Sequence, residues 1–266
     1  MKFLTLNTHS WMEKEAEEKF QLLLQDILDK DYDLICFQEI NQEMTSPEVE
    51  VNNHYQALPS AEPIHQDLVE KLAEKGKNYY WTWAYNHIGY DRYHEGVAIL
   101  SKTPIKAREI LVSDVDDPTD YHTRRVALAE TEVEGKELAL ASVHLSWWDK
   151  GFQEEWARFE AVLKELNKPL ILAGDFNNPA GQEGYQAILA SPLGLQDAFE
   201  VAKERSGSYT VPPEIDGWKG NTEPLRIDYV FTTKELEVES LQVVFDGRNS
   251  PQVSDHYGLN AVLTWK

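Results

Sequence analysis

The feature that most constrains the fold of this chain is a series of short apolar runs that stop abruptly at polar side chains. The segment 170–181, LILAGDFNNPAG, is one example, because its apolar start leads directly to Gly174, Asp175 and Asn177. An apolar run of this length, bounded by turn residues, is typical of a buried strand. Its polar end has two explanations of equal weight: an ordinary Asn-Asn-Pro turn, or a strand that presents a carboxylate and an amide to a shared site.

The same arrangement recurs where other strand patterns stop. A single asparagine, glutamate or histidine in such a place is usually a turn residue, a helix cap or a hydrogen-bonded core side chain. Repetition at separate strand ends favours a site instead, because strand ends at one edge of a sheet are where such proteins assemble sites. The residues concerned are Asn7, His9, Glu39, His144, Asp175, Asn177, Asp228, Asp255 and His256.

The rest of the pattern alternates strands with helices. Residues 13–30 carry apolar side chains at helical spacing, with acidic residues early in the segment, which predicts a helix. This mixture predicts sheets that pack face to face with helices outside, in one domain over 1–266. Strands are expected at 2–8, 33–39, 96–101, 106–112, 125–133, 137–145, 170–177, 226–232, 236–245 and 256–265, and further helices near 62–75, 152–167 and 181–190.

The charge of the chain restricts its partners. Its 266 residues include 25 Lys and Arg against 46 Asp and Glu, a formal net charge of -21. Nonspecific binding to nucleic acid or to an anionic membrane needs a basic surface, so this field opposes both. A small substrate, or one held through a metal cation, is less affected. We therefore expect a small-molecule partner, with no long nucleic acid and no membrane.

Three further observations indicate a cytoplasmic protein. No apolar run approaches the roughly 20 residues that span a bilayer. The N-terminal MKFLTLNTHSW reaches Asn7 and His9 too early to form the apolar centre of a signal peptide. The single cysteine, Cys36, lies in the apolar stretch LICF, where a buried and unreactive thiol is expected.

The types of polar residue at the strand ends suit one chemistry. Glu39, Asp255 and the amide oxygen of Asn7 are hard oxygen ligands, which favour Mg²⁺ or Mn²⁺ over zinc. Two histidines and the other carboxylates supply groups for proton transfer and for the stabilisation of developing charge. The combination predicts metal-assisted hydrolysis of a phosphoester.

Seven motifs, from residue 4 to 259, resemble in order those of the endonuclease/exonuclease/phosphatase superfamily. This family includes pancreatic-type deoxyribonucleases, abasic-site endonucleases, neutral sphingomyelinases and inositol polyphosphate phosphatases. The resemblance implies an α/β fold of four layers, an α/β/β/α sandwich in which two mixed sheets lie face to face. The motifs are LTLNTHS (4–10), FQEIN (37–41), EGVAILSK (95–102), SVHL (142–145), LAGDFNNP (172–179), RIDYVF (226–231) and SDHYGL (254–259).

The resemblance also implies roles for the strand-end residues. Asn7, Glu39 and Asp255 match the shell of the divalent metal. Asp175 matches the carboxylate that polarises the attacking water, although a histidine remains an alternative general base. The other matches are Asn177, which orients the nucleophile or phosphate, His144 and His256 on two sides of the phosphate, Asp228, which holds His256 in one tautomer, and Glu95, a site position in some relatives.

The substrate is predicted from the segments between motifs. Aromatic residues are dense at 78–94, 146–151 and 216–220, read here as connecting segments, and they are either ordinary core or faces for sugar rings. Trp147, Trp148 and Trp218 are candidates for substrate contact, and His9 is a further candidate. Arg124 and Arg125 precede a strand. Either one of them binds phosphate through two hydrogen bonds, or both are solvent-exposed residues at the start of the strand.

The early NTHSW and the length are most similar to the bacterial maltose 6'-phosphate phosphatases of this superfamily. We therefore expect a metal-dependent phosphatase that acts on a small phosphorylated sugar. The alternative is a nuclease or another phosphodiesterase acting on nucleic acid. A sphingomyelinase-like lipid phosphodiesterase is disfavoured, and so is a non-catalytic binding module, because every expected catalytic position is filled.

Overall fold

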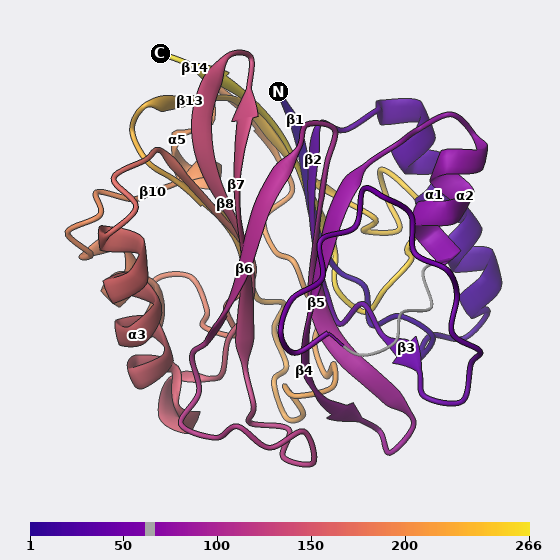
Figure 1. Ribbon diagram of the computed structural model, residues 1–266. Coiled ribbons are helices and arrows are strands. Elements are labelled where there is room, and N and C mark those ends of the chain that lie inside the picture. Colours follow the sequence, from indigo (N-terminus) through magenta and orange to yellow (C-terminus); the bar gives the residue numbers. More distant parts are fainter. Residues whose placement is uncertain (62–66) are drawn as a thin grey trace.

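The computed structural model describes residues 1–61 and 67–266, which form two β-sheets packed face to face (Figure 1). The strands of the eight-stranded sheet are β1 (Lys2–Asn7), β2 (Leu34–Gln38), β3 (Gln42–Glu43), β4 (Tyr80–Gly89), β5 (Tyr93–Ser101), β11 (Glu204–Ser206), β13 (Leu236–Val244) and β14 (Gly258–Trp265). Those of the six-stranded sheet are β6 (Ile105–Leu111), β7 (Arg125–Val133), β8 (Lys136–His144), β9 (Leu170–Asp175), β10 (Gln196–Asp197) and β12 (Asp228–Thr232).

Both sheets mix parallel and antiparallel pairs. The eight-stranded sheet has the order β11-β13-β14-β1-β2-β5-β3, with β4 paired to β5, and the six-stranded sheet has the order β10-β12-β9-β8-β7-β6. The pairs β1/β2 and β8/β9 are parallel, so the carboxyl ends of each pair meet at one edge of their sheet.

Helices cover the outer face of each sheet. The helices α1 (Ala16–Lys30) and α2 (Asp67–Glu74) bury their apolar sides against β1, β2, β4 and β5. On the other side, α3 (Phe152–Lys164) and α4 (Glu183–Leu189) pack against β7, β8, β9 and β12. The short α5 (Ala198–Val201) follows β10, and a 3₁₀ turn (Trp148–Lys150) precedes α3. The predicted α/β/β/α sandwich is confirmed.

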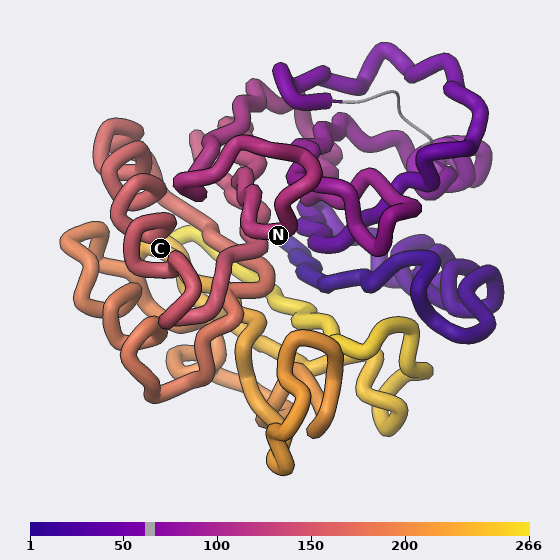
Figure 2. The backbone as a smooth tube through the Cα atoms, turned by 90° about the horizontal axis from the view of Figure 1, so that it is seen from below, coloured from indigo at the N-terminus to yellow at the C-terminus, as the bar shows by residue number. Residues whose placement is uncertain are grey.

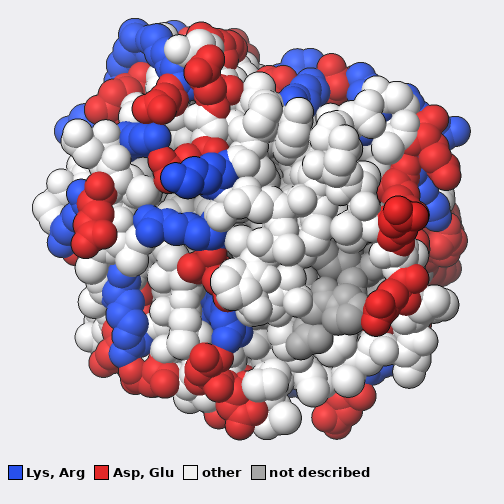
Figure 3. Space-filling view, viewed as in Figure 1, with Lys and Arg blue, Asp and Glu red and all other residues white. Residues whose placement is uncertain are grey.

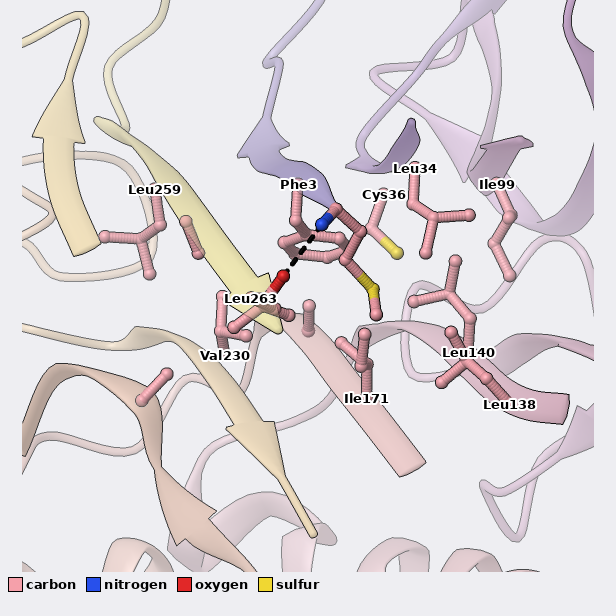
Figure 4. Close-up of a cluster of buried hydrophobic side chains, with 14 of the residues drawn as sticks. Phe3, Leu34, Cys36, Ile99, Leu138, Leu140, Ile171, Val230, Leu259 and Leu263 are labelled. Carbon is pink, nitrogen blue, oxygen red and sulfur yellow. Dashed lines mark hydrogen bonds between the residues drawn. The ribbon is translucent and has the colours of Figure 1, made fainter. Parts of the chain in front are cut away.

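The centre of the molecule is the apolar layer between the two sheets (Figure 4). Phe3 and Cys36 from the eight-stranded sheet meet Leu140, Ile171 and Val230 from the six-stranded sheet, and all five are fully buried. The Cys36 thiol lies 3.7 Å from the carbonyl oxygen of Ala141, and burial raises its pKa. The expectation of a buried thiol is confirmed.

Most element boundaries predicted from the sequence lie within a few residues of those observed. The helix expected over 13–30 begins at Ala16, and the helix expected over 152–167 ends at Lys164. The helix expected near 62–75 corresponds to α2, while its part at 62–66 lies outside the described residues.

The interpretation of 78–94 as a connecting segment is wrong, because most of it forms the ten-residue strand β4 and the start of β5. Its aromatic residues alternate with small ones at the strand period. Trp81, Trp83 and Tyr85 face the helices α1 and α2, while Ala84 faces the layer between the sheets. Most of the aromatic side chains of β4 therefore belong to the core.

The strand register places three candidate residues in one row. His144 at the end of β8 pairs with Asp175 at the end of β9, and Asp175 pairs with Asp228 at the start of β12. Residues in register on adjacent strands point to the same face of a sheet. The fold thus brings together side chains that lie up to 84 residues apart in sequence, between His144 and Asp228.

No helix among the described residues is both long and apolar enough to cross a membrane.

The central layer makes a stability prediction. Replacing Ile171 by alanine removes a fully buried side chain from the contact between the sheets, and we expect the free energy of unfolding to fall by about 2–5 kcal/mol. Urea denaturation followed by circular dichroism measures the change. Val201→Ala, at a side chain that is 43% exposed, is the control and should change the free energy by less than about 0.5 kcal/mol. A loss below about 1 kcal/mol for Ile171→Ala would contradict the close packing of this layer.

Candidate active site

The candidate residues line a cavity of about 370 Å³ between the ends of the two sheets. Figure 2 looks from below onto this end of the sandwich, where segments from early, middle and late parts of the chain converge. The lining residues include all of the polar strand-end residues except Asn7 and Asp228, which lie behind them, together with an aromatic rim formed by Tyr90, Tyr121 and Trp147. They are His9, Glu39, His87, Ile88, Gly89, Tyr90, Glu95, Tyr121, Arg124, His144, Trp147, Lys150, Asp175, Asn177, Asp216, Gly217, Asp255 and His256.

Asp175 lies at the centre of the hydrogen-bond network. Its Oδ1 accepts a bond of 2.8 Å from the backbone N–H of Asn177, and its Oδ2 accepts one of 3.1 Å from Nδ2 of Asn7. The preceding Gly174 has a φ of +136°, and a Cβ there would lie 2.2 Å from the carbonyl oxygen of Val143. Glycine is therefore required for β9 to approach β8 this closely and to direct Asp175 into the cavity.

Asn7 connects Asp175 to the other sheet. The same Nδ2 donates a bond of 2.9 Å to Oε1 of Glu39, and Oδ1 of Asn7 accepts a bond of 3.1 Å from the N–H of His9. In this structure the amide nitrogen faces the carboxylates. The role expected for the amide oxygen of Asn7 as a metal ligand therefore needs the amide group to turn over.

His256 is held by Asp228 and faces Asp175. Its Nδ1 lies 3.0 Å from Oδ2 of Asp228, and its Nε2 lies 3.7 Å from Oδ2 of Asp175. Burial alone would lower the pKa of His256, but Asp228 and Asp175 outweigh it and hold the pKa well above the usual value. The imidazole therefore carries a positive charge, and the contact with Asp228 fixes its Nδ1–H.

His144 lies on the opposite side of Asp175 and has the opposite character. Burial and the charge of Arg124 lower the pKa of His144 well below its usual value, so its ring is neutral. A guanidinium N–H of Arg124 donates to Nδ1 at 3.3 Å, which leaves the proton of the neutral ring on Nε2. That nitrogen lies 3.7 Å from Oδ2 of Asp175 and 3.8 Å from Oε1 of Glu39.

Glu95 contacts the three basic side chains on the same side of the cavity as His144. Its carboxylate lies 3.4 Å from Nε2 of His87, 3.7 Å from Arg124 and 3.7 Å from Nδ1 of His144. Burial acts to raise the pKa of Glu95, but His87 and Arg124 overcome it and lower the pKa. Of the two arginines considered from the sequence, Arg124 lines the cavity. The other, Arg125, points away to Asp116 and to the carbonyl oxygen of Tyr85.

The carboxylates fit a divalent metal. Burial and Glu95 raise the pKa of Glu39 to about 7, and burial and Asp228 raise the pKa of Asp175 to about 7. Ligand atoms of Glu39, Asp175 and His144 lie within 4.8 Å of one another. A bound cation stabilises two such close carboxylates, of which Asp175 is buried and Glu39 partly buried, and oxygen donors suit Mg²⁺ or Mn²⁺.

Asp255 and His9 lie at the outer edge of this carboxylate cluster. Nδ1 of His9 is 3.4 Å from Oδ1 of Asp255 and 2.8 Å from Oε1 of Glu13. Burial opposes protonation of His9, but the bond to Glu13 and the charges of Glu39 and Asp255 raise its pKa to about 9. Ligand atoms of Asp255, His9 and Glu13 lie within 4.8 Å of one another and form a group separate from that of Glu39, Asp175 and His144.

The three tryptophans suggested for substrate contact have different environments. Trp147 lines the cavity, with the Lys150 ammonium 4.7 Å from its ring centre. Trp148 does not line the cavity; it starts the 3₁₀ turn and packs against Phe152 in the outer core, which corrects the expectation for this residue. Trp218 also lies outside the lining set, and its Nε1 donates a bond of 3.1 Å to Oδ1 of Asn177.

Sequence reasoning missed His87, Tyr90, Tyr121, Lys150 and Asp216, which all line the cavity. His87 lies beyond a register shift in β4, between Tyr85 and His87, that sets it opposite Glu95. His87 lies close to Glu95 because of this bulge, and the local sequence pattern does not predict the bulge. The others come from turns and loops, whose positions depend on tertiary packing.

Comparisons with known proteins agree with this geometry. A sequence model of the Endonuclease/Exonuclease/phosphatase family matches residues 12–256. Nocturnin of Xenopus laevis is 25% identical over 224 residues, which cover 77% of this chain and 50% of that protein. The chain thus spans about half the length of the curated relatives it matches.

Among the similar solved structures, two examples are matched over the full length of both chains. An endonuclease/exonuclease/phosphatase family protein from Leptotrichia buccalis C-1013-b has 29% identity and a TM-score of 0.85. A mannosyl-6-phosphatase from Bacteroides thetaiotaomicron VPI-5482 has 17% identity and a TM-score of 0.70, which shows a shared fold.

The match over residues 12–256 covers most of the chain, and the acidic and histidine clusters of the cavity suit the divalent-metal dependence of this family. The chain belongs to the Endonuclease/Exonuclease/phosphatase family.

Proposed function

We propose that the protein is a phosphatase that releases phosphate from a small phosphorylated sugar such as maltose 6'-phosphate. The observation that carries this proposal is a pair of buried donors in the cavity wall. Among the described residues, Nε of Arg124 and Nε1 of Trp147 have no hydrogen-bond partner. Arg124 is only 3% exposed, and a buried N–H without a partner costs free energy unless a ligand accepts from it.

The inner part of the cavity suits one phosphate group. Arg124 and protonated His256 supply positive charge, and Nε2–H of His144 supplies a further donor. The two imidazoles each lie 3.7 Å from Asp175, which is held by two hydrogen bonds, and Arg124 lies behind His144. A phosphoryl group in this place has donors on several sides, which stabilise the charge that develops on its oxygens during transfer.

Two residues of the chain then carry out the proton transfers of the reaction. Asp175 takes a proton from the attacking water, whose oxygen forms the new bond to phosphorus. Protonated His256 gives the proton at Nε2 to the sugar oxygen as the bond from phosphorus to that oxygen breaks, and Asp228 keeps its ring oriented. Glu39, Asp255 and a turned Asn7 amide would hold a divalent cation, which would supply charge to polarise the phosphoryl oxygens.

The outer part of the cavity suits a sugar. Trp147 offers a flat ring and an unpaired indole N–H, and Lys150 and Asp216 lie beside it. The formal net charge of -21 disfavours a long polyanion, and on the face in Figure 3 lysines and arginines are interspersed with acidic residues. The mannosyl-6-phosphatase of similar fold lends further support to a sugar phosphate.

A nuclease or another phosphodiesterase is the second candidate. The family to which the chain belongs is named for endonucleases and exonucleases as well as phosphatases. The same aromatic rim would stack on a base instead of a sugar ring. Specificity constants for maltose 6'-phosphate, glucose 6-phosphate and single- and double-stranded DNA distinguish the two, and faster cleavage of DNA would overturn the sugar proposal.

Metal removal tests the carboxylate cluster. We expect chelation to abolish hydrolysis and added Mg²⁺ or Mn²⁺ to restore it. Glu39→Gln replaces a charged ligand by a neutral one, so it should weaken metal binding measured by titration calorimetry. Glu154→Gln, at an exposed position on α3, is the matched control. Full activity in excess chelator would exclude the proposed role of the cluster.

Substitutions at the centre test the catalytic assignment. Asp175→Asn removes the proton acceptor and His256→Ala removes the imidazolium, and each should lower kcat by about 10²-fold or more. Asp29→Asn on the exposed side of α1 is the control and should leave kcat unchanged. Steady-state kinetics measures the effect, with circular dichroism to confirm folding. Turnover near the original value in either variant would remove that residue from the mechanism.

Truncation of the rim tests the sugar assignment. Trp147→Ala should raise KM for maltose 6'-phosphate by about tenfold or more and change KM for p-nitrophenyl phosphate far less, because only the sugar reaches the indole. Trp265→Phe, which removes an indole N–H that donates to Val133 on the far side of the fold, is the control. An equal rise in KM for both esters would mean that Trp147 does not contact the sugar.

A further inference from the structure

We propose that a loop formed by residues 211–225 closes one side of the cleft between the sheets. The site then accepts the end of a small phosphomonoester and blocks a chain that has to pass through it. The contact between Tyr90 and Asp216 is the specificity-determining element. This inference rests on the proposed phosphatase function and deepens it, because it specifies a terminal phosphate.

The loop is a closed unit with its own small core. Its two ends are joined by a bridge in which the N–H of Val211 donates to Leu225 at 3.0 Å and the N–H of Leu225 donates to Val211 at 3.1 Å. Inside it, buried Val211 and Ile215 pack with Ile227. The loop therefore has a defined shape of its own, unlike an open surface connection.

The loop is also fastened to the catalytic residues. Trp218 belongs to its apolar core and donates its indole N–H to Oδ1 of Asn177 at 3.1 Å. Gly217 has a φ of +76°, and a Cβ there would lie 2.8 Å from Cζ2 of Trp147. The backbone of the loop thus lies directly against the wall of the cavity, and only glycine allows this approach.

Tyr90 reaches the loop from the opposite sheet. Its hydroxyl donates a bond of 2.9 Å to Oδ2 of Asp216, across 126 positions in sequence. Tyr90 belongs to the turn between β4 and β5 of the eight-stranded sheet, while Asp216 lies in the segment that leads to β12 of the six-stranded sheet. Both residues line the cavity, so their contact spans its mouth. The turn and the orange segment before β12 lie at the lower end of Figure 1.

The turn that carries Tyr90 has an unusual sequence for its shape. Tyr90 and Asp91 both have positive φ, of 55° and 53°, in a two-stranded hairpin turn. Such a turn favours glycine and asparagine, and a bulky tyrosine is disfavoured there. A strained residue that also reaches across a cavity is characteristic of a functional constraint.

The closure has a direct consequence for the substrate. A phosphodiester within a polymer, bound at Asp175, has chain on both sides of its phosphorus and needs two open exits. A monoester has one substituent and needs only one. The Tyr90–Asp216 contact obstructs an exit, and the Asp216 carboxylate repels further phosphates there.

The experiment compares kcat/KM for p-nitrophenyl phosphate with kcat/KM for a single-stranded oligodeoxynucleotide. In Tyr90→Ala the ratio of diester to monoester activity should rise by about tenfold or more, and Tyr90→Phe, which keeps the ring but loses the bond, should show a smaller rise. Asp216→Ala opens the same contact from the other side and should match the effect of Tyr90→Ala. Because Asp216→Ala tests the same contact, the experiment still decides the question if one of the two variants does not fold.

The control is Tyr32→Phe, which removes a similar bond of 3.0 Å from a tyrosine hydroxyl to the Asp26 carboxylate, away from the cavity. It should leave the ratio unchanged. An unchanged ratio in Tyr90→Ala and Asp216→Ala, with the protein still preferring monoesters, overturns this inference alone. Preferential cleavage of the oligonucleotide by the unaltered protein overturns the proposed function as well.

Discussion

The site depends on one contact, in which the Asn7 amide holds the partly buried carboxylate of Glu39 beside the buried carboxylate of Asp175. Asn7 and Glu39 come from the ends of β1 and β2, and Asp175 comes from β9, so this amide joins the two sheets. Buried carboxylates lose hydration and repel each other, and such an arrangement persists only where donors and positive groups surround it. Protonated His256 on one side and Arg124 behind His144 on the other supply that charge.

The apolar layer between the sheets fixes the distance between the residues that make this contact. Ile171 and Val230 lie four and two residues along β9 and β12 from Asp175 and Asp228, and both are fully buried. Close-packed interiors transmit small shifts, so the packing of this layer sets the distances between the strand ends. The chemistry is therefore carried by rigid strands, whereas substrate contacts lie on the turns and loops around them, a division that many folds share.

Much of the site follows from the sequence because it depends on local pattern. Asp175 and Asn177 are predicted by the apolar run that precedes them, and the row of His144, Asp175 and Asp228 follows once the strands are placed in register. The aromatic rim is predicted only in part. Trp147 and Trp148 are neighbours in sequence, yet one lines the cavity and the other packs in the core, because a 3₁₀ turn begins between them.

The sequence by itself determined most of the strands, the polar ends that carry the chemistry and the family, because each of these depends on short stretches of residues; the strand β4 is an exception. Only the tertiary structure decided which distant side chains meet. His87 faces Glu95 because of a bulge in β4, and Tyr90 reaches Asp216 across 126 positions. The physical reason is that local pattern controls periodicity and turns, whereas contacts between loops depend on how the two sheets pack and twist against each other.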